Sequence, residues 1–290
     1  MTMRSLLLGT AVIGAGALGA APFVVPTTAP GATECRTALF TLRTGMPGAG
    51  TGYADAKVSA TCTGSTLVVT SNGIPSYRFI KMTPHSLTTQ DWTWTVTLRP
   101  KTASRTTSIR RRLGTIGFTV TGIPVYGPME GPMPSDEAYG DPKYNGWLDA
   151  CGGHTGPGSE YHDHVINPAG RCGFAANTIV GYAIDGFPIY GPRGCLNAGC
   201  TTTAVMTSGY RRTGNPTRDA WSAYTYRASR STTALDRCNG RTQPDGSYGY
   251  HVTSAFPYVI GCFRGTPRTQ AGPAGGPMPP MGPGGPPPPR

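Results

Sequence analysis

The chain has 290 residues, of which 42 are Gly and 29 are Pro, and only 13% are charged. So many helix-breaking residues exclude a mainly helical protein, while the 38% of hydrophobic residues excludes a chain that is disordered throughout. The formal net charge is +11, but the one dense basic run, at 110–112, has no aromatic residues between its arginines and no nucleic-acid-binding motif around it. We therefore expect a mainly β protein with long Gly/Pro-rich loops. The charge argues for anionic envelope or extracellular polymers as partners, and against nucleic acid.

Residues 1–21 have the pattern of a secretory signal peptide. Arg4 precedes an apolar run from Leu6 to Leu18, and small residues follow at a plausible cleavage site. Residues 22–33 are rich in Pro, Thr and Ala and are expected to form a linker. No later apolar stretch is long enough for a transmembrane helix. These features predict a protein that is secreted or retained in the cell envelope.

Export would place eight cysteines in an oxidising compartment, where an even number favours disulfides. Zinc sites built on thiolates need close Cys-x-x-Cys pairs, and the sequence has none. We expect a local set of pairs: Cys35 with Cys62, Cys151 with Cys172, Cys195 with Cys200, and Cys238 with Cys262. The second and fourth pairs would hold equivalent places in two related segments described below.

Residues 34–112 are expected to form a β-rich N-terminal part. The run 66–70 is rich in β-branched residues, and 91–98 alternates with the period of a strand. Trp92 and Trp94 share one face of that second strand, and core packing is the favoured interpretation over a platform for carbohydrate. His85 lies alone in a Thr/Pro-rich loop and is predicted to be a surface histidine.

The rest of the chain contains two related units. Residues 116–128 (IGFTVTGIPVYGP) are similar to 180–192 (VGYAIDGFPIYGP), and 148–165 aligns with 235–252 over 18 residues with nine identities. Proline cannot donate to a β-ladder, so each Gly-x-Pro-x-Tyr-Gly-Pro box should lie at a sheet edge or leave the sheet. We expect one domain over 113–265 with internal repeats at 113–172 and 179–264, stapled by disulfides. Residues 266–290 are expected to be a disordered Pro/Gly-rich tail.

Three motifs carry a resemblance to a known family. CGGH followed by YHDHV, the segment IDGFPIYGP, and LDRCNG followed by a Tyr-rich His box are similar to the YHYH-domain family of secreted proteins, over about 71–265. The resemblance implies a secreted module and assigns no reaction to it. The chain departs from the pattern at Asp163, which replaces the second Tyr of the first motif, and at Gly249, which replaces the first His of the second. Arg241 stands where a CNGH box would have a His, so the second unit is poorer in metal ligands.

Three of the five histidines lie within eleven positions, at 154–164. In an extended segment, His162 and His164 project to one face and Asp163 to the other, and the Gly-Pro turn at 156–158 can return His154 to them. Neutral imidazoles suit Zn(II) or Cu(II) among other transition metals, and three nitrogens with an open fourth position is an arrangement typical of catalytic zinc. The predicted metal ligands are His154, His162, His164 and, from the second unit, His251. Three acids could ligate the metal or orient an imidazole: Asp149, Glu160 and Asp236.

Two other interpretations remain open from the sequence. The histidines and tyrosines could form a buried hydrogen-bonded network without metal, in a structural or interaction module. Alternatively, a histidine with an acid, such as His164 with Asp236, could act as a general base in a hydrolase, although no Gly-x-Ser-x-Gly motif is present. No organic cofactor is expected.

Overall fold

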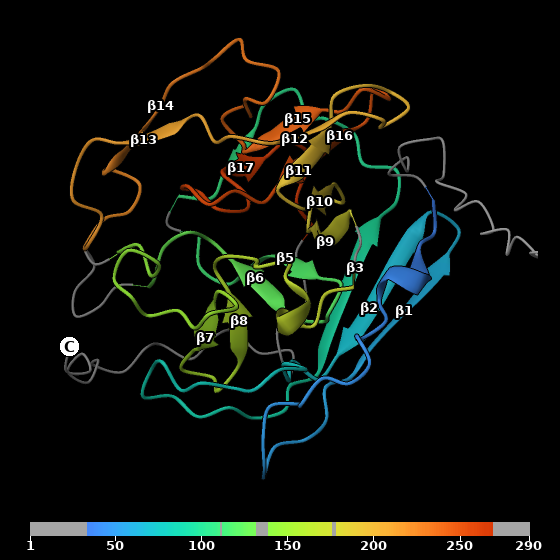
Figure 1. The fold of residues 1–290 in the computed structure, drawn as a ribbon, viewed down its shortest axis with the longest axis vertical. Coiled ribbons are helices and arrows are strands. Elements are labelled where there is room, and N and C mark those ends of the chain that lie inside the picture. Colours follow the sequence, from blue (N-terminus) through green and yellow to red (C-terminus); the bar gives the residue numbers. More distant parts are fainter. Residues whose placement is uncertain (1–33, 111, 132–138, 176–177, 269–290) are drawn as a thin grey trace, which may run out of the picture.

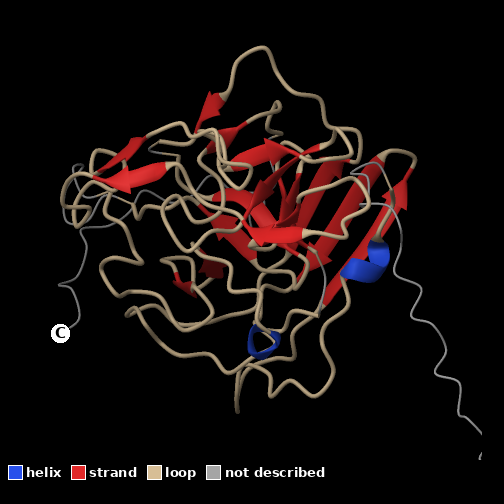
Figure 2. Ribbon diagram, turned by 45° about the horizontal axis from the view of Figure 1, so that its top comes forward, coloured by secondary structure: helices blue, strands red, loops and turns tan. Residues whose placement is uncertain are grey.

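The computed structural model describes residues 34–110, 112–131, 139–175 and 178–268 (Figure 1). The predicted signal peptide, the linker and nearly all of the predicted tail lie outside these residues. Within them, strands and loops predominate, and the helices are the short 3-10 turns η1 (Thr37–Leu39) and η2 (Gly170–Cys172) (Figure 2). No helix in this part of the chain has the length and apolar character needed to cross a membrane. The prediction of a mainly β protein is confirmed.

The N-terminal part forms a three-stranded antiparallel sheet of β1 (Val58–Thr63), β2 (Thr66–Ser71) and β3 (Trp92–Thr97), in that order. Alternation along β3 buries Trp92 and Trp94, which are 2% and 0% exposed, so neither ring has a face available for a carbohydrate. Trp94 stacks on Phe118, with ring centroids 4.8 Å apart and planes at 5°. This contact joins the small sheet to the main one in a single hydrophobic core.

The main sheet has eight short strands in the order β15-β16-β10-β9-β5-β6-β8-β7. Their bounds are β5 (Thr115–Thr119), β6 (Pro124–Tyr126), β7 (Gly153–Thr155), β8 (Tyr161–Asp163), β9 (Ile179–Ala183), β10 (Pro188–Tyr190), β15 (Gly240–Thr242) and β16 (Tyr248–His251). In the first unit, β6 is antiparallel to β5 and parallel to β8, which is antiparallel to β7. In the second unit, β10 is likewise antiparallel to β9 and parallel to β16, which is antiparallel to β15. The antiparallel pair β5–β9 joins the units, so segments of similar sequence hold corresponding places from the two ends of the sheet.

The two Gly-Pro boxes form β6 and β10, which lie inside the sheet and not at its edge. Pro124 and Pro188 are tolerated because each is the first residue of its strand, where a missing N–H matters least. The prediction that each box lies at an edge or leaves the sheet is therefore wrong for 124–126 and 188–190, and both strands end at Tyr126 and Tyr190, before the second proline of the box.

The segment between the units adds two small hairpins. One pairs β11 (Arg193–Cys195) with β12 (Thr203–Val205), and the other pairs β13 (Tyr210–Arg212) with β14 (Tyr224–Tyr226). Near the end of the second unit, β17 (Cys262–Phe263) pairs with β4 (Thr107–Ser108), which precedes the first.

All four predicted disulfides are formed: Cys35–Cys62, Cys151–Cys172, Cys195–Cys200 and Cys238–Cys262. The second and fourth bonds close the Cys/His segments of the two units. Each links a residue before the hairpin to one after it, and so limits how far the hairpin can move.

Candidate metal centre

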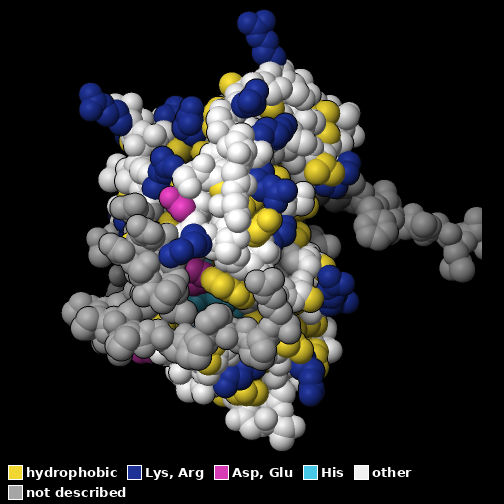
Figure 3. All heavy atoms as spheres, turned by 90° about the vertical axis from the view of Figure 1, so that its left-hand side faces the viewer, with side chains coloured by type: hydrophobic (Ala, Val, Ile, Leu, Met, Phe, Trp, Pro, Cys, Tyr) yellow, Lys and Arg dark blue, Asp and Glu magenta, His cyan; other side chains and the backbone are white. Residues whose placement is uncertain are grey.

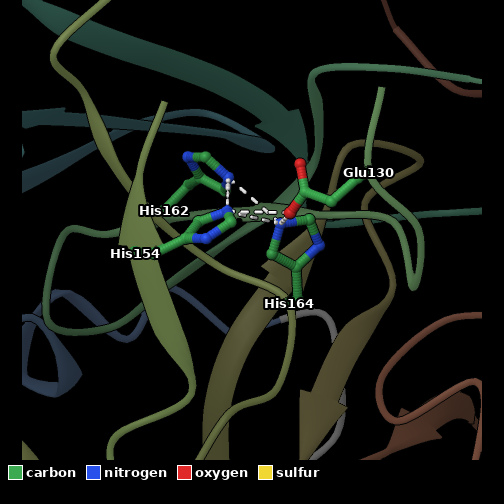
Figure 4. A group of neighbouring side chains, drawn as sticks. All are labelled: Glu130, His154, His162 and His164. Atoms are coloured by element: carbon green, nitrogen blue, oxygen red, sulfur yellow. Dashed lines mark hydrogen bonds and ion pairs between the residues drawn. The ribbon is translucent and has the colours of Figure 1, made fainter. Parts of the chain in front are cut away.

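The β7–β8 hairpin brings the first-unit histidines to one face. His154 on β7 pairs directly with His162 on β8, and His164 follows two residues later on the same side. Figure 4 shows the three rings pointing inward at one another. Tyr161 and Asp163 alternate to the opposite face, and the Tyr161 hydroxyl meets the hydroxyl of Tyr77 at 3.1 Å.

The Nε2 atoms of the three histidines form a nearly equilateral triangle. The distances are 3.1 Å from His154 to His162, 3.1 Å from His162 to His164 and 3.2 Å from His164 to His154. Ligand atoms bound at 2.0–2.1 Å around a tetrahedral metal lie about 3.3–3.4 Å from one another. The triangle therefore has the dimensions of three ligand positions on one ion.

Glu130 provides a fourth ligand atom from the loop that follows β6. Its Oε1 lies 2.9 Å from His154 Nε2 and 3.1 Å from His164 Nε2, and the four ligand atoms all lie within 4.8 Å of one another (Figure 4). The sequence analysis did not select Glu130. The signal that could have found it is its place directly after the first Gly-Pro box, whose Tyr and Gly also contact the histidines.

Backbone carbonyls determine which ring nitrogens of two histidines carry protons. His154 Nδ1 lies 3.2 Å from the Trp147 carbonyl oxygen, and His164 Nδ1 lies 2.5 Å from that of Gly127. A carbonyl can only accept, so both Nδ1 atoms are donors, and in the neutral rings Nε2 has a lone pair. In the described part of the chain, the buried Glu130 Oε1 has no hydrogen-bond donor other than these two rings. Lone pairs this close repel one another unless a cation lies between them.

His162 is positioned by an aromatic ring and an acid. The Tyr126 ring stacks on it with centroids 4.0 Å apart and planes at 17°. Its Nδ1 is buried without a hydrogen-bond partner, and the nearest acid oxygen is Glu160 Oε1 at 3.9 Å. The Tyr126 hydroxyl donates to that same Oε1 at 3.4 Å. Of the three predicted acids, Glu160 is therefore the one whose position best suits orienting an imidazole.

The electrostatics of the cluster favour a positive charge inside it. Burial opposes ionisation of Glu130, yet positive charge on the His164 and His154 rings holds the pKa of this carboxyl well below its ordinary value. In the same way, burial opposes a charge on His154, but the Glu130 carboxylate raises the pKa of this imidazole above its ordinary value. Burial lowers the pKa of His162 well below its ordinary value, and the charges of His154 and His164 act in the same direction. A neutral His162 is the form that can donate a lone pair to a metal.

The other two predicted acids have a structural role. Asp149 Oδ1 accepts hydrogen bonds from the backbone N–H groups of Cys151 and Gly152 at 2.8 and 3.0 Å. The turn needs a glycine at 152, because φ is +103° there and a side chain would collide with the Val165 carbonyl. Asp236 holds the equivalent turn of the second unit through the N–H of Cys238 at 2.8 Å and does not meet His164. The His164–Asp236 pair considered for a hydrolase is therefore not formed.

His251 does not join the cluster. It lies on β16, near the opposite end of the sheet from β8. Its Nδ1 donates to the Gly191 carbonyl oxygen at 2.9 Å, as His164 does to Gly127, and its Nε2 lies 3.0 Å from Gln243 Nε2. Burial lowers the pKa of His251 to about 4, so it is neutral at pH 7 and accepts from Gln243.

The remaining ligand positions of the second unit are lost. Arg241 replaces His154 and is directed to the Met206 sulfur at 3.2 Å. Gly249 replaces His162, and the Tyr190 ring occupies the space a side chain would need. Gly194 stands at the position of Glu130, close to His251. One centre, and not two, is available in the described residues.

The predicted surface histidine, His85, borders the centre. Its carbonyl accepts from the Thr155 hydroxyl at 3.0 Å, and the Thr83 hydroxyl donates to the Thr155 carbonyl at 2.7 Å, so this loop is fixed to the end of β7. Burial lowers the pKa of His85, and the charge of His154 lowers it further. His85 is thus a half-buried neighbour of the centre.

The sequence was also compared with known protein families, curated proteins and solved structures. Residues 93–265 match the family model described as YHYH protein. The match covers more than half of the chain, which therefore belongs to the YHYH protein family. It begins inside β3 and includes both units. No curated protein and no solved structure matches the chain.

Proposed function

We propose that this protein binds one transition-metal ion through His154, His162, His164 and Glu130. The observation that carries the proposal is the triangle of Nε2 atoms with sides of 3.1–3.2 Å. When the three rings are neutral, two of them direct their only N–H to a backbone carbonyl, so at most the proton of His162 is left for the three Nε2–Nε2 contacts. A cation satisfies all the inward lone pairs at once.

The ligand set favours Zn(II) or Cu(II). Imidazole nitrogen is a preferred donor for both ions, while Mg(II) and Ca(II) prefer sites built from oxygen. Three imidazoles with one carboxylate also match the number of ligands of a tetrahedral zinc site.

Export of the protein is part of the same proposal. Four disulfides link all eight cysteines, a usage typical of oxidising compartments. The signal-peptide pattern at 1–21 points to the same route. The folded protein would then acquire its metal during or after secretion.

The test is metal content by mass spectrometry on untagged protein purified from its secretion route. We expect one transition-metal ion per chain, lost in the double variant His162→Ala/His164→Ala. The matched control is His251→Asn, which changes the corresponding histidine of the second unit and should retain the metal. Circular dichroism should show that all three proteins are folded.

The opposite result would be wild-type protein that is isolated without metal and takes up neither Zn(II) nor Cu(II). The cluster would then be structural, and the protein a metal-free module. Its net charge of +11 would direct the search for partners to anionic polymers.

A further inference from the structure

We infer that the coordination position held by Glu130 is the exchangeable one, and that small oxyanions, carboxylates above all, bind the metal there. The inference rests on the proposed metal site and adds the class of ligand that the site accepts. In it, the three histidines hold the ion, and Glu130 occupies the position that an incoming ligand takes.

The side chain of Glu130 is more exposed to solvent than those of the three histidines. The side chains of His154, His162 and His164 are 3%, 3% and 1% exposed, whereas that of Glu130 is 20% exposed. A small patch of histidine surface with acidic surface beside it is visible in the space-filling view (Figure 3). A ligand from solvent would therefore reach the ion past Glu130.

The four residues also differ in how firmly the backbone and hydrogen bonds hold them in place. His154 and His162 lie on paired strands, and His154 and His164 are each anchored through Nδ1 to a backbone carbonyl. Glu130 projects from the loop after β6, and among the described residues its carboxylate makes close polar contacts only with His154 and His164. Displacing Glu130 thus breaks no anchor of the three imidazoles.

The positive charge of a metal held by three neutral imidazoles favours an anionic ligand. Three neutral imidazoles leave the full double charge of a divalent ion uncompensated, and Glu130 supplies the negative oxygen that balances part of it. A ligand that replaces Glu130 must offer the same chemistry, which a small carboxylate does. The second unit shows that the fold accepts the loss of this side chain, since Gly194 stands at the corresponding position.

The experiment uses Co(II) as a spectroscopic replacement for the native metal and follows its visible spectrum in the full-length protein. Azide and acetate are the probes, titrated into wild type, Glu130→Ala, Glu130→Gln and the control His251→Asn. His251 is the buried counterpart of His164 in the second unit and lies outside the ligand group. We expect both Glu130 variants to bind Co(II) within about tenfold of the wild-type affinity. They should show a spectral change with azide that acetate suppresses, at anion concentrations that leave wild type and His251→Asn unchanged.

Two results would overturn the inference while leaving the metal site intact. One is loss of Co(II) from both Glu130 variants as complete as in His162→Ala/His164→Ala, which would make Glu130 a holding ligand. The other is an identical anion response in the Glu130 variants and in His251→Asn. Wild-type protein that fails to bind Co(II) at all would instead contradict the proposed function itself.

Discussion

His164 and His251 make the same backbone contact in two different surroundings. Both donate from Nδ1 to the carbonyl of the second glycine of a Gly-Pro box, at Gly127 and Gly191. This bond fixes the neutral tautomer and directs Nε2 away from the box. In the first unit Nε2 meets two other imidazoles, whereas in the second it meets Gln243. The same anchor thus belongs to a candidate metal centre and to a buried polar contact.

The burial of His251 beside Gln243 predicts that the stability of the protein depends on pH. The folded-state pKa of His251 is lowered to about 4 from 6.5, because burial disfavours the charged ring. Between these values the unfolded chain binds a proton that the folded protein does not, so the free energy of unfolding decreases as the pH falls through this window. The His251 contribution should be about 1.4 kcal/mol per pH unit.

Urea unfolding at pH 7, 6 and 5, with a chelator present, measures this slope. His251→Asn should lose the contribution and show a shallower dependence than wild type. Equal slopes for the two proteins would mean that His251 does not titrate as the structure indicates.

At the scale of elements, the two hairpins differ in their metal ligands but not in their closure. Each places a histidine beside its Gly-Pro strand and is closed by a disulfide, Cys151–Cys172 in the first unit and Cys238–Cys262 in the second. Equivalent disulfides on a hairpin with the candidate ligands and on one without them provide an internal comparison.

Removing either staple by Cys→Ser double substitution should lower stability by about 2–4 kcal/mol, since each constrains a loop of similar length. Only loss of Cys151–Cys172 should also weaken metal binding, because that bond restrains the β7–β8 hairpin. Denaturant titration and metal titration of the two variants measure the two effects. If both variants lost metal affinity equally, the effect would come from global stability and not from the hairpin.

At the scale of the whole molecule, the candidate centre connects separate parts of the chain. Glu130 comes from the loop after β6, the histidines from the β7–β8 hairpin, and Thr83 and His85 fix the N-terminal part against β7. A metal that binds only the folded protein stabilises all of these parts together.

At a free metal concentration of 100 times Kd, the free energy of unfolding should rise by about 2.7 kcal/mol. Thermal or urea unfolding with and without the metal measures the gain. His162→Ala/His164→Ala should show none of it, and a gain of equal size in that variant would place metal binding elsewhere.

The sequence by itself determined those features that depend on spacing along the chain. Alternation in an extended segment placed His162 and His164 on one face, and the Gly-Pro turn returned His154 to them. The spacing of the cysteines favoured the four local disulfides that form, although eight cysteines allow 105 pairings and the sequence alone does not choose among them. Composition alone indicated the β-rich, loop-rich class. Each of these outcomes follows from local geometry, which the spacing of residues along the chain indicates.

Tertiary structure decided the rest. Glu130 lies 24 positions before His154, and only the parallel pairing of β6 with β8 brings the loop after β6 to the histidines. His251, the equivalent of His164 in sequence, is directed to Gln243 because β16 occupies the far half of the sheet. The Gly-Pro boxes lie inside the sheet, where Pro124 and Pro188 each begin a strand. In all three cases the deciding factor is which strands become neighbours, and that depends on packing of the whole chain and not on the spacing of residues along it.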